Sequence, residues 1–271
     1  MPRTARRLDR PTPLGRLRET VQVAAALLRL ADWRLNAPPW PGFPRPYAGQ
    51  WARRDAIGAL VASFRPDAIV ETGTFLGIST KHLAGYAVPV HTVEIKPAYY
   101  HLARLNLRRK ANVTLHCGRS LDALQVLGTD GAIERPLAYL AAHWWEDLPL
   151  DAEVRHLLSR WDDVLVVVDD CRVPDDDGYG YDVYGGVAIS LVHLAVGSEV
   201  AAAYPAVPAV REGGARRGTL YLAQGPRARA SLADAAGFEV ERRWRDRLDR
   251  FSENLFRPIA PPRHRTQRPA P

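Results

Sequence analysis

Val164–Val168 is an unbroken apolar run with acidic residues on both sides. A strand that is apolar on both faces must be covered by helices on both, which is typical of parallel sheets. Four similar segments precede it, separated by helical patterns: 67–72, 88–95, 112–117 and 136–141. Two later segments, 199–204 and 218–223, are expected to form an antiparallel pair at one edge. The pattern therefore predicts an α/β fold with a doubly wound, mostly parallel sheet of seven strands.

Prolines and apolar periodicity divide the chain into parts. Pro38, Pro39, Pro41, Pro44 and Pro46 predict a stiff linker. Ahead of it, apolar residues at helical spacing predict an amphipathic helix over 14–35, which would dock on its own domain or on a second copy as a homodimer. We expect four parts: a helical N-terminal extension with a Pro-rich linker (1–48), the main domain (49–225), a C-terminal helical and strand extension (226–257) and a disordered tail (258–271).

The net charge of +7 comes from the two ends of the chain. Residues 1–54 and 226–271 are basic on balance, whereas 55–225 carry more acidic than basic residues. A protein that acts on nucleic acid is expected to carry its basic surface around the site, so no nucleic-acid partner is expected. No segment approaches the ~20 apolar residues of a membrane-spanning helix. The two cysteines imply no disulfide framework and fit a reducing cytoplasm.

Ligands of open α/β sheets bind at the carboxyl ends of the strands, so the residues that follow each strand carry the most information. The first strand runs into the sequence Glu71-Thr-Gly-Thr-Phe-Leu-Gly-Ile-Ser-Thr80. Gly73 and Gly77 allow a sharp turn and the close approach of a ligand. Ser79 and Thr80 add hydroxyls to the free N–H groups of a helix start, which together would cradle a carboxylate. The alternative is a glycine pair that serves only the packing of helix on strand.

The second and third strands also end in polar residues. Glu94 ends the second strand, where a carboxylate can accept both hydroxyls of a ribose, and a surface acid is the alternative. Gly118 and Ser120 follow the third strand, where a small residue and a hydroxyl suit the edge of an adenine. The alternative for Ser120 is a plain N-cap of the next helix.

Taken in order, the segments ETGTFLGIST, HTVEIKPAYY, HCGRSLDAL, YLAAHWWEDLPL and VVVDDCRVPDDDGYGYD resemble those of a class I S-adenosylmethionine (SAM)-dependent methyltransferase, over about residues 50–225. The resemblance implies SAM as the cofactor. It also implies the contacts of each part of the cofactor: Glu71, Gly73, Thr74, Gly77 and Ser79 around the methionine part, Glu94 on the ribose, Gly118 and Ser120 near the adenine, and His143 with Trp144 closing over it.

The segments after the fourth and fifth strands resemble those of small metal-dependent O-methyltransferases of the catechol and sugar types. In that family an acid after the fourth strand and an Asp-Asp or Asp-Asn pair after the fifth bind Mg²⁺, which lowers the pKa of the acceptor hydroxyl. Asp169 and Asp170 match the pair and imply Mg²⁺ as a second cofactor. Ala141 stands where the first acid is usual, which leaves Glu146, Asp147 or one of Asp175–Asp177 as substitutes.

Two residues are candidates for catalysis. Asp169 is expected to orient the acceptor or to take its proton. His143 has two open roles, a general base near neutral pH or a structural partner of the adenine. The loop 173–182, dense in acids and tyrosines, is expected to cover the substrate at the mouth of the site, with a solvated acidic loop as the alternative.

We therefore expect a cytoplasmic bacterial enzyme that methylates an oxygen of a small-molecule acceptor. N-methylation and metal-free O-methylation by a base remain open. A degenerate methyltransferase fold that acts as an interaction protein also remains open. Ala141 favours this hypothesis, and it is opposed by the intact set of Glu71, Gly73, Gly77 and Glu94. Amino-group methylation of DNA would call for an Asn/Asp-Pro-Pro-Tyr/Phe segment after the fourth strand, and the sequence has none there.

Overall fold

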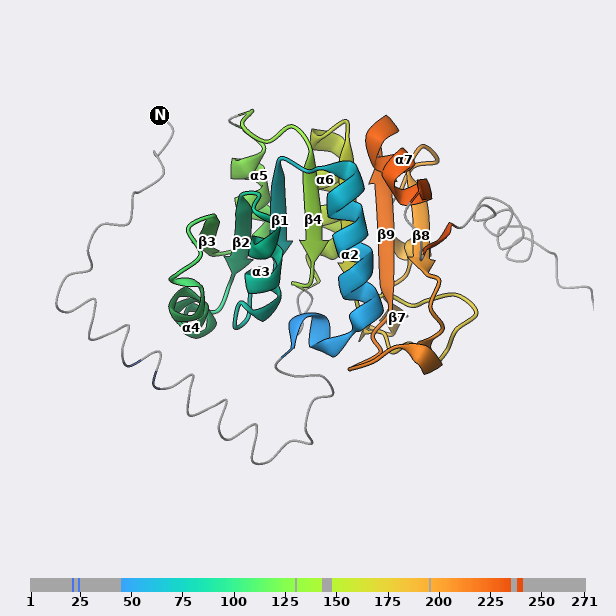
Figure 1. The fold of residues 1–271 in the computed structure, drawn as a ribbon, viewed down its shortest axis with the longest axis horizontal. Coiled ribbons are helices and arrows are strands. Elements are labelled where there is room, and N and C mark those ends of the chain that lie inside the picture. The colour runs from blue at the N-terminus through green and yellow to red at the C-terminus, as the bar shows by residue number, and fades with distance from the viewer. Residues whose placement is uncertain are drawn as a thin grey trace, which may run out of the picture. The chain divides into compact units, whose positions relative to one another are not determined.

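The computed structural model describes residues 45–129, 131–142, 148–194, 196–234 and 238–240, together with positions 21 and 24. Within these residues one sheet has the strand order β10-β8-β9-β5-β4-β1-β2-β3 (Figure 1). Its strands are β1 Ala68–Thr72, β2 Val90–Glu94, β3 Val113–Cys117, β4 Pro136–Leu140, β5 Val164–Asp169, β8 Ala201–Pro205, β9 Thr219–Gln224 and β10 Phe238–Val240.

The direction of the strands confirms the predicted fold class. Strands β1 to β5 pair in parallel, and β9 lies antiparallel between β5 and β8. The two late segments therefore form the antiparallel pair expected at one edge. A short further strand, β10, pairs antiparallel with β8 and extends that edge beyond the seven predicted strands.

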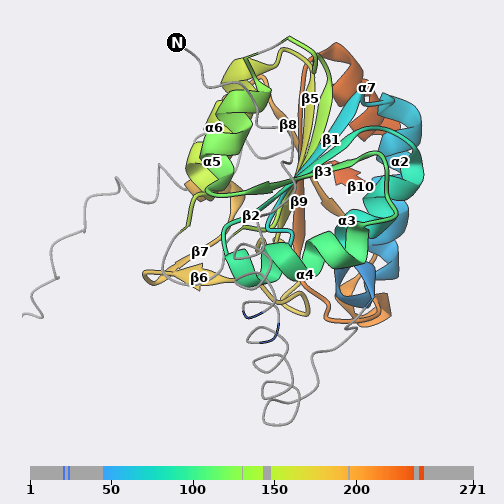
Figure 2. The ribbon, with the colours of Figure 1, turned by 90° about the vertical axis from the view of Figure 1, so that its left-hand side faces the viewer.

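Helices cover both faces of the sheet, as the unbroken apolar strands require (Figure 2). Helices α5 (Ser120–Leu127) and α6 (Leu150–Arg160) pack on one face. Helices α2 (Trp51–Phe64), α3 (Ile78–Leu83) and α7 (Pro226–Asp234) pack on the other. Helix α4 (Pro97–Leu107) lies beside β2 and β3. The short elements are η1 Pro46–Gly49, η2 Ala84–Tyr86, η3 Leu191–His193, η4 Ala209–Arg211 and the hairpin of β6 (Val183–Tyr184) with β7 (Val187–Ala188).

The alternation of side chains along each strand decides which residues meet at the end of the sheet. In β5, Val164, Val166 and Val168 face α5 and α6, so Leu165, Val167 and then Asp169 face the side of α2 and α3. The register pairs Glu71 with Tyr139 and Tyr139 with Val167. Glu71, Tyr139 and Asp169 therefore lie on one face, at the carboxyl ends of three neighbouring strands.

The parts expected at the two ends of the chain are described only in part. Helix 14–35 lies outside the described residues except for Val21 and Ala24, which are helical and exposed, and the tail 258–271 lies outside them entirely. Tyr47, expected in the linker, is buried in the core under α2 and α3. Helix α7 and strand β10 of the expected C-terminal extension pack on the sheet. Among the described helices, none has the length and apolar character needed to cross a bilayer.

Candidate active site

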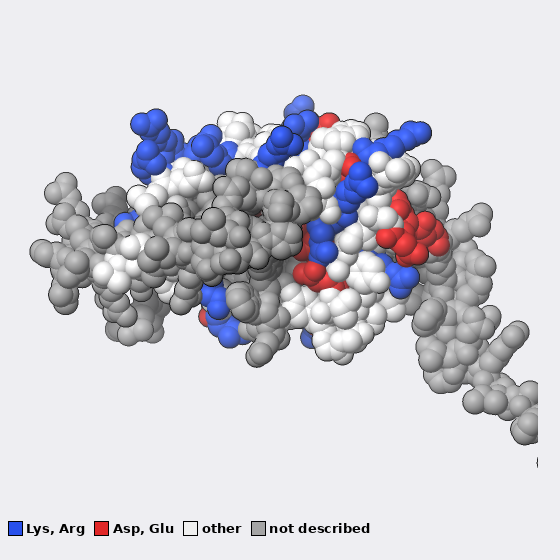
Figure 3. Space-filling model, turned by 90° about the horizontal axis from the view of Figure 1, so that it is seen from below, with Lys and Arg blue, Asp and Glu red and all other residues white. Residues whose placement is uncertain are grey.

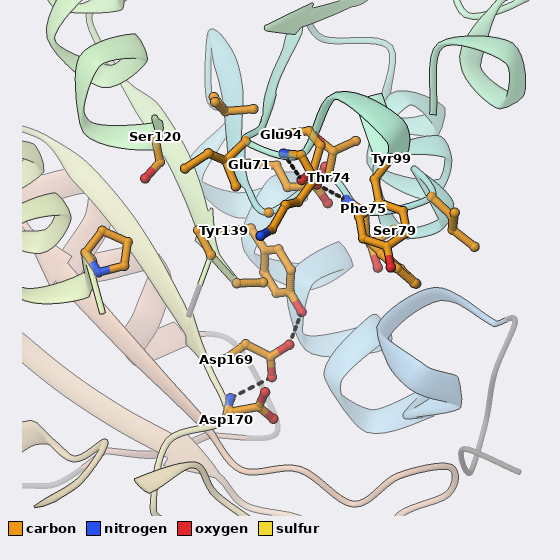
Figure 4. Close-up of a pocket in the computed structure, with 18 of the residues that line it drawn as sticks. Glu71, Thr74, Phe75, Ser79, Glu94, Tyr99, Ser120, Tyr139, Asp169 and Asp170 are labelled. Atoms are coloured by element: carbon orange, nitrogen blue, oxygen red, sulfur yellow. Dashed lines mark hydrogen bonds between the residues drawn. The ribbon is translucent and has the colours of Figure 1, made fainter. Parts of the chain in front are cut away.

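A cavity of about 820 Å³ opens at the carboxyl ends of the parallel strands. Figure 3 views the molecule from this side and shows basic and acidic side chains next to one another on that face. The cavity wall contains nine of the predicted site residues: Glu71, Gly73, Thr74, Ser79, Glu94, Gly118, Ser120, Asp169 and Asp170. Figure 4 shows most of them around a common space. Gly77 does not line the cavity, and His143 and Trp144 lie outside the described residues.

Steric and backbone constraints explain why Gly73 and Gly77, in the turn that follows β1, are glycines. Gly73 has a φ of +83°, and a Cβ there would lie 2.5 Å from the carbonyl oxygen of Ala141. Gly77, the N-cap of α3, has a φ of +72°, and a Cβ there would lie 2.9 Å from Leu107. The backbone of the segment after β4 therefore excludes a side chain at Gly73, whereas a side chain at Gly77 would be strained mainly by the positive φ.

Glu94 is held in place by backbone N–H groups. Those of Phe75 and Lys96 each donate to one oxygen of its carboxylate, both at 2.8 Å. Burial raises the pKa of Glu94, and these backbone hydrogen bonds oppose the rise. A carboxylate has about four acceptor positions, and Glu94 lines the cavity, so it keeps acceptor capacity for the hydroxyl of a ligand such as a ribose.

Glu71 is buried among threonine hydroxyls beneath the same turn. Thr80 and Thr92 both donate to its Oε2 atom, Thr92 at 2.6 Å, and the Thr74 hydroxyl lies 2.6 Å from that of Thr92. Burial raises the pKa of Glu71 to about 7, although the two hydroxyls lower it. Glu71 therefore presents a polar group to the cavity that changes charge near neutral pH.

The hydroxyls predicted to cradle a carboxylate point in different directions. Ser79 lines the cavity, and its Oγ atom accepts from the Tyr47 backbone N–H at 3.2 Å. Thr80 instead faces the interior, where it binds Glu71. Ser120 is the first residue of α5, whose N-cap is Arg119, and it lines the cavity rather than capping the helix with its side chain.

The Asp169 carboxylate is surrounded by donors. Arg53 binds its Oδ1 atom, Tyr139 donates to Oδ2 at 2.7 Å, and the Asp170 N–H donates to Oδ1 at 2.7 Å. Figure 4 shows the bond from Tyr139 to Asp169 at the lower end of the cavity. Burial, together with the charge of Asp169, raises the pKa of Tyr139 well above its usual value, so this phenol stays neutral.

Arg53 enters this network from the first turn of α2 and is only 3% exposed. Burial alone would lower the pKa of Arg53. The negative charge of Asp169 outweighs this effect and the net pKa is raised, so the guanidinium stays charged. Its Nη2 atom donates to the carbonyl oxygens of Arg217 at 2.5 Å and Gly218 at 3.3 Å. The Glu212 carboxylate accepts the backbone N–H groups of Ala52 and Arg53. One buried arginine thus joins α2 to the ends of β4, β5 and β9.

Asp170 is paired with a second arginine. Arg217 donates through Nε to Asp170 at 2.5 Å and through Nη2 to Asp182. Gln50 fixes the backbone of Arg217 in both directions, accepting its N–H and donating to its carbonyl oxygen, each at 2.8 Å. Asp170 itself has a φ of +53°, a conformation that aspartate tolerates better than most residues.

Mg²⁺ does not fit the donor set at this position. Both carboxylates of the predicted pair already bind arginine, and the missing acid at Ala141 is not replaced by Asp175–Asp177, which do not line the cavity. Among the described residues, no group of three or more His, Cys, Asp or Glu side chains is placed to hold an ion. Glu146 and Asp147, the other proposed substitutes, lie outside the described residues.

The acidic loop 173–182 is tied to the body of the domain. Tyr179 is buried, and its hydroxyl donates to the Val207 carbonyl at 2.7 Å. Asp176 accepts the Ala209 N–H at 2.8 Å, and Gly180 exchanges backbone hydrogen bonds with Arg216 and Gly218. The residues that line the cavity come from either side of this loop rather than from it.

The cavity lining also includes polar residues that were not predicted, among them Tyr47, Arg53, Tyr139 and Arg217. Tyr139 had a usable signal, because it stands two residues before Ala141 and so shares its face of the sheet. The sequence contains no comparable signal for Arg53 or Arg217, because each arginine binds a carboxylate that is distant in the sequence.

No family model matches this chain, and no curated protein matches it. Solved structures do resemble it. The O-methyltransferase TomG from Streptomyces achromogenes, crystallised with SAM, is 21% identical over 64% of this chain and 80% of its own, with a TM-score of 0.47. The O-methyltransferase from Bacillus cereus in complex with SAH is 20% identical over 75% of this chain and 90% of its own, with a TM-score of 0.49. At these identities and TM-scores, nothing about this chain's acceptor follows from the resemblance.

Proposed function

We propose that this protein transfers the methyl group of SAM to an oxygen atom of a small-molecule acceptor. The observation that carries the proposal is the division of one cavity into two chemically different ends. Residues 73–76, Glu94 and Ser120 line one end, while Tyr139, Asp169 and Asp170 line the other. The cavity volume of about 820 Å³ falls within the range of ligand sites.

The first end has the donors and acceptors that a nucleoside with an amino-acid tail requires. Glu94 accepts the ribose hydroxyls, and Gly118 and Ser120 leave room at the adenine edge. The backbone after Gly73 comes close enough to contact the tail because no side chain intervenes. Glu71 adds a carboxyl group beneath the tail. These contacts hold the cofactor in a fixed orientation relative to the end of β5.

When bound, SAM supplies an electrophilic methyl group on a positively charged sulfur. The acceptor oxygen forms the new bond to this carbon as the carbon–sulfur bond breaks, and the acceptor proton leaves to a base. We assign Asp169 to acceptor orientation, because three donors already hold its carboxylate. Asp170, which also lines the cavity, receives the proton. The neutral Tyr139 phenol lines the cavity beside Asp169 and donates to its carboxylate.

The test is the formation of S-adenosylhomocysteine by the purified full chain with a panel of hydroxylated small molecules. We expect SAM-dependent product that is one methyl group heavier than its acceptor, and a loss of turnover of at least tenfold in Asp170→Asn. Binding of SAM without turnover of any oxygen acceptor would favour the interaction protein instead. Turnover confined to amine acceptors would show N-methylation.

A further inference from the structure

Two arginines converge on the acid pair at the end of β5. Arg53 reaches Asp169 from α2, and Arg217 reaches Asp170 from the segment just before β9. Both pairs are largely shielded from water, with Asp169 and Asp170 side chains 15% and 14% exposed. The positive charge that such a pair needs is therefore supplied by the chain itself.

The neighbouring strand contributes no negative charge at this point. The parallel register pairs Leu140 with Val168, which brings Ala141 beside Asp169. An ion at this place would thus find one carboxylate fewer, and a guanidinium group already binds the Oδ1 atom of each of the two remaining carboxylates. Mg²⁺ prefers a shell of oxygen ligands and gives up its waters reluctantly, so it competes poorly with pre-placed cations.

Arg217 is positioned for this role by two independent sets of contacts. Gln50 holds its backbone on both sides, as described above. Its guanidinium bridges Asp170 to Asp182, on the far side of the loop that follows β5. These two acids raise the pKa of Arg217 more than burial lowers it, so its charge is retained.

We propose that Arg53 and Arg217 are built-in counter-cations that take the place of a divalent metal ion on Asp169 and Asp170. They act as positioning residues, because each holds a carboxylate of the acceptor end in a fixed orientation. The positioning role of the two arginines rests on the proposed function, because it concerns the methyl-transfer reaction. The exclusion of a metal ion rests only on the contacts between the arginines and the two aspartates.

The replacement restricts the class of acceptor. A guanidinium group can donate hydrogen bonds to an acceptor oxygen, but it cannot coordinate that oxygen as a Lewis acid and lower its pKa as far as a metal ion does. The attacking oxygen must then lose its proton to a carboxylate without metal assistance. A phenol, with a pKa of about 10, meets this condition, and an aliphatic alcohol or sugar hydroxyl does not. The acceptor is therefore expected to be a phenol.

The experiment measures Mn²⁺ binding to the full chain by electron paramagnetic resonance, with cofactor absent. The wild type should bind Mn²⁺ no more tightly than millimolar. Arg217→Gln releases Asp170 and Asp182 and should bind at least tenfold more tightly, whereas Arg217→Lys keeps the positive charge and should remain as weak as the wild type. Arg229→Gln removes an exposed arginine elsewhere and should also change nothing.

Ala141→Asp provides a second variant that leaves both arginines in place. It should remain a weak binder of Mn²⁺ on its own, and should become a tight one when Arg217→Gln is added. Micromolar binding by the wild type or by Ala141→Asp alone would overturn the proposal, as would unchanged weak binding in a folded Arg217→Gln. Methylation of phenols that EDTA abolishes and Mg²⁺ restores would also overturn it. A failure to bind SAM would instead count against the proposed function and leave these metal results standing.

Discussion

Glu71 is predicted to make the protein less stable as the pH rises from about 4.5 to about 7. Its side chain is 1% exposed, and burial raises its pKa from 4.5 to about 7. Below about pH 4.5 the folded and unfolded states both carry the proton, so the group has no effect on stability. As the pH rises, the unfolded state ionises first, and the folded state loses stability until about pH 7. At about 1.4 kcal/mol per pH unit, the total loss is about 3 kcal/mol.

Glu71→Gln is the variant that isolates this effect. The amide resembles the neutral carboxyl group and keeps an oxygen that accepts from Thr80 and Thr92. At pH 5 the variant should be as stable as the wild type to within about 1 kcal/mol. At pH 8 it should be the more stable protein, by up to about 3 kcal/mol.

Urea unfolding followed by tryptophan fluorescence between pH 5 and 8 measures both proteins. Titrations common to the two cancel in the difference between their free energies of unfolding. Glu134→Gln, at an exposed acid, is the matched control and should run parallel to the wild type. Parallel curves for Glu71→Gln and the wild type would refute the reasoning, since they would show that Glu71 ionises alike in both states.

Two further variants test the contacts around the cavity. Arg53→Met should lower the free energy of unfolding by about 3–5 kcal/mol, because it leaves Asp169 charged without its partner, and adding Asp169→Asn should restore part of the loss. Arg155→Met, which removes an exposed ion pair, should cost less than about 1 kcal/mol in the same urea assay. Gly73→Ala should lower SAM affinity at least tenfold in calorimetry. Gly131→Ala has a similar φ but open space around it, so it should leave SAM affinity unchanged.

The strands could be predicted because short uninterrupted apolar runs in the sequence indicate buried strands. Val164–Val168 is apolar throughout and proves to be fully covered, and the predicted antiparallel pair is found at the edge of the sheet. The end of the cavity lined by Glu71, Gly73 and Glu94 could also be predicted, because these residues lie at or just after the carboxyl ends of parallel strands, which end together.

The acceptor end could not be predicted because its contacts join distant parts of the chain. Arg53 sits in the charged run Arg53-Arg54-Asp55, which looks like the solvated face of a helix, yet its guanidinium is buried against Asp169. Arg217 lies in a loop whose partner acids stand in another loop. The acid pair was recognised, but its electrostatic partners depend on tertiary packing. The homodimer, the cytoplasmic location and the adenine contacts of His143 and Trp144 stay predictions.

The central claim is that this cavity binds SAM with Glu94 on the ribose, and calorimetric titration of the full chain with SAM tests it most directly. The account predicts saturable binding by the wild type. In Glu94→Ala the affinity should fall by about 1.5–3 kcal/mol, or roughly tenfold to a hundredfold, because the ribose hydroxyls lose a charged acceptor. Glu94→Gln should lie between the two, and Glu134→Ala should match the wild type. Absence of heat and of thermal stabilisation at millimolar SAM would contradict the account, as would equal affinity in Glu94→Ala.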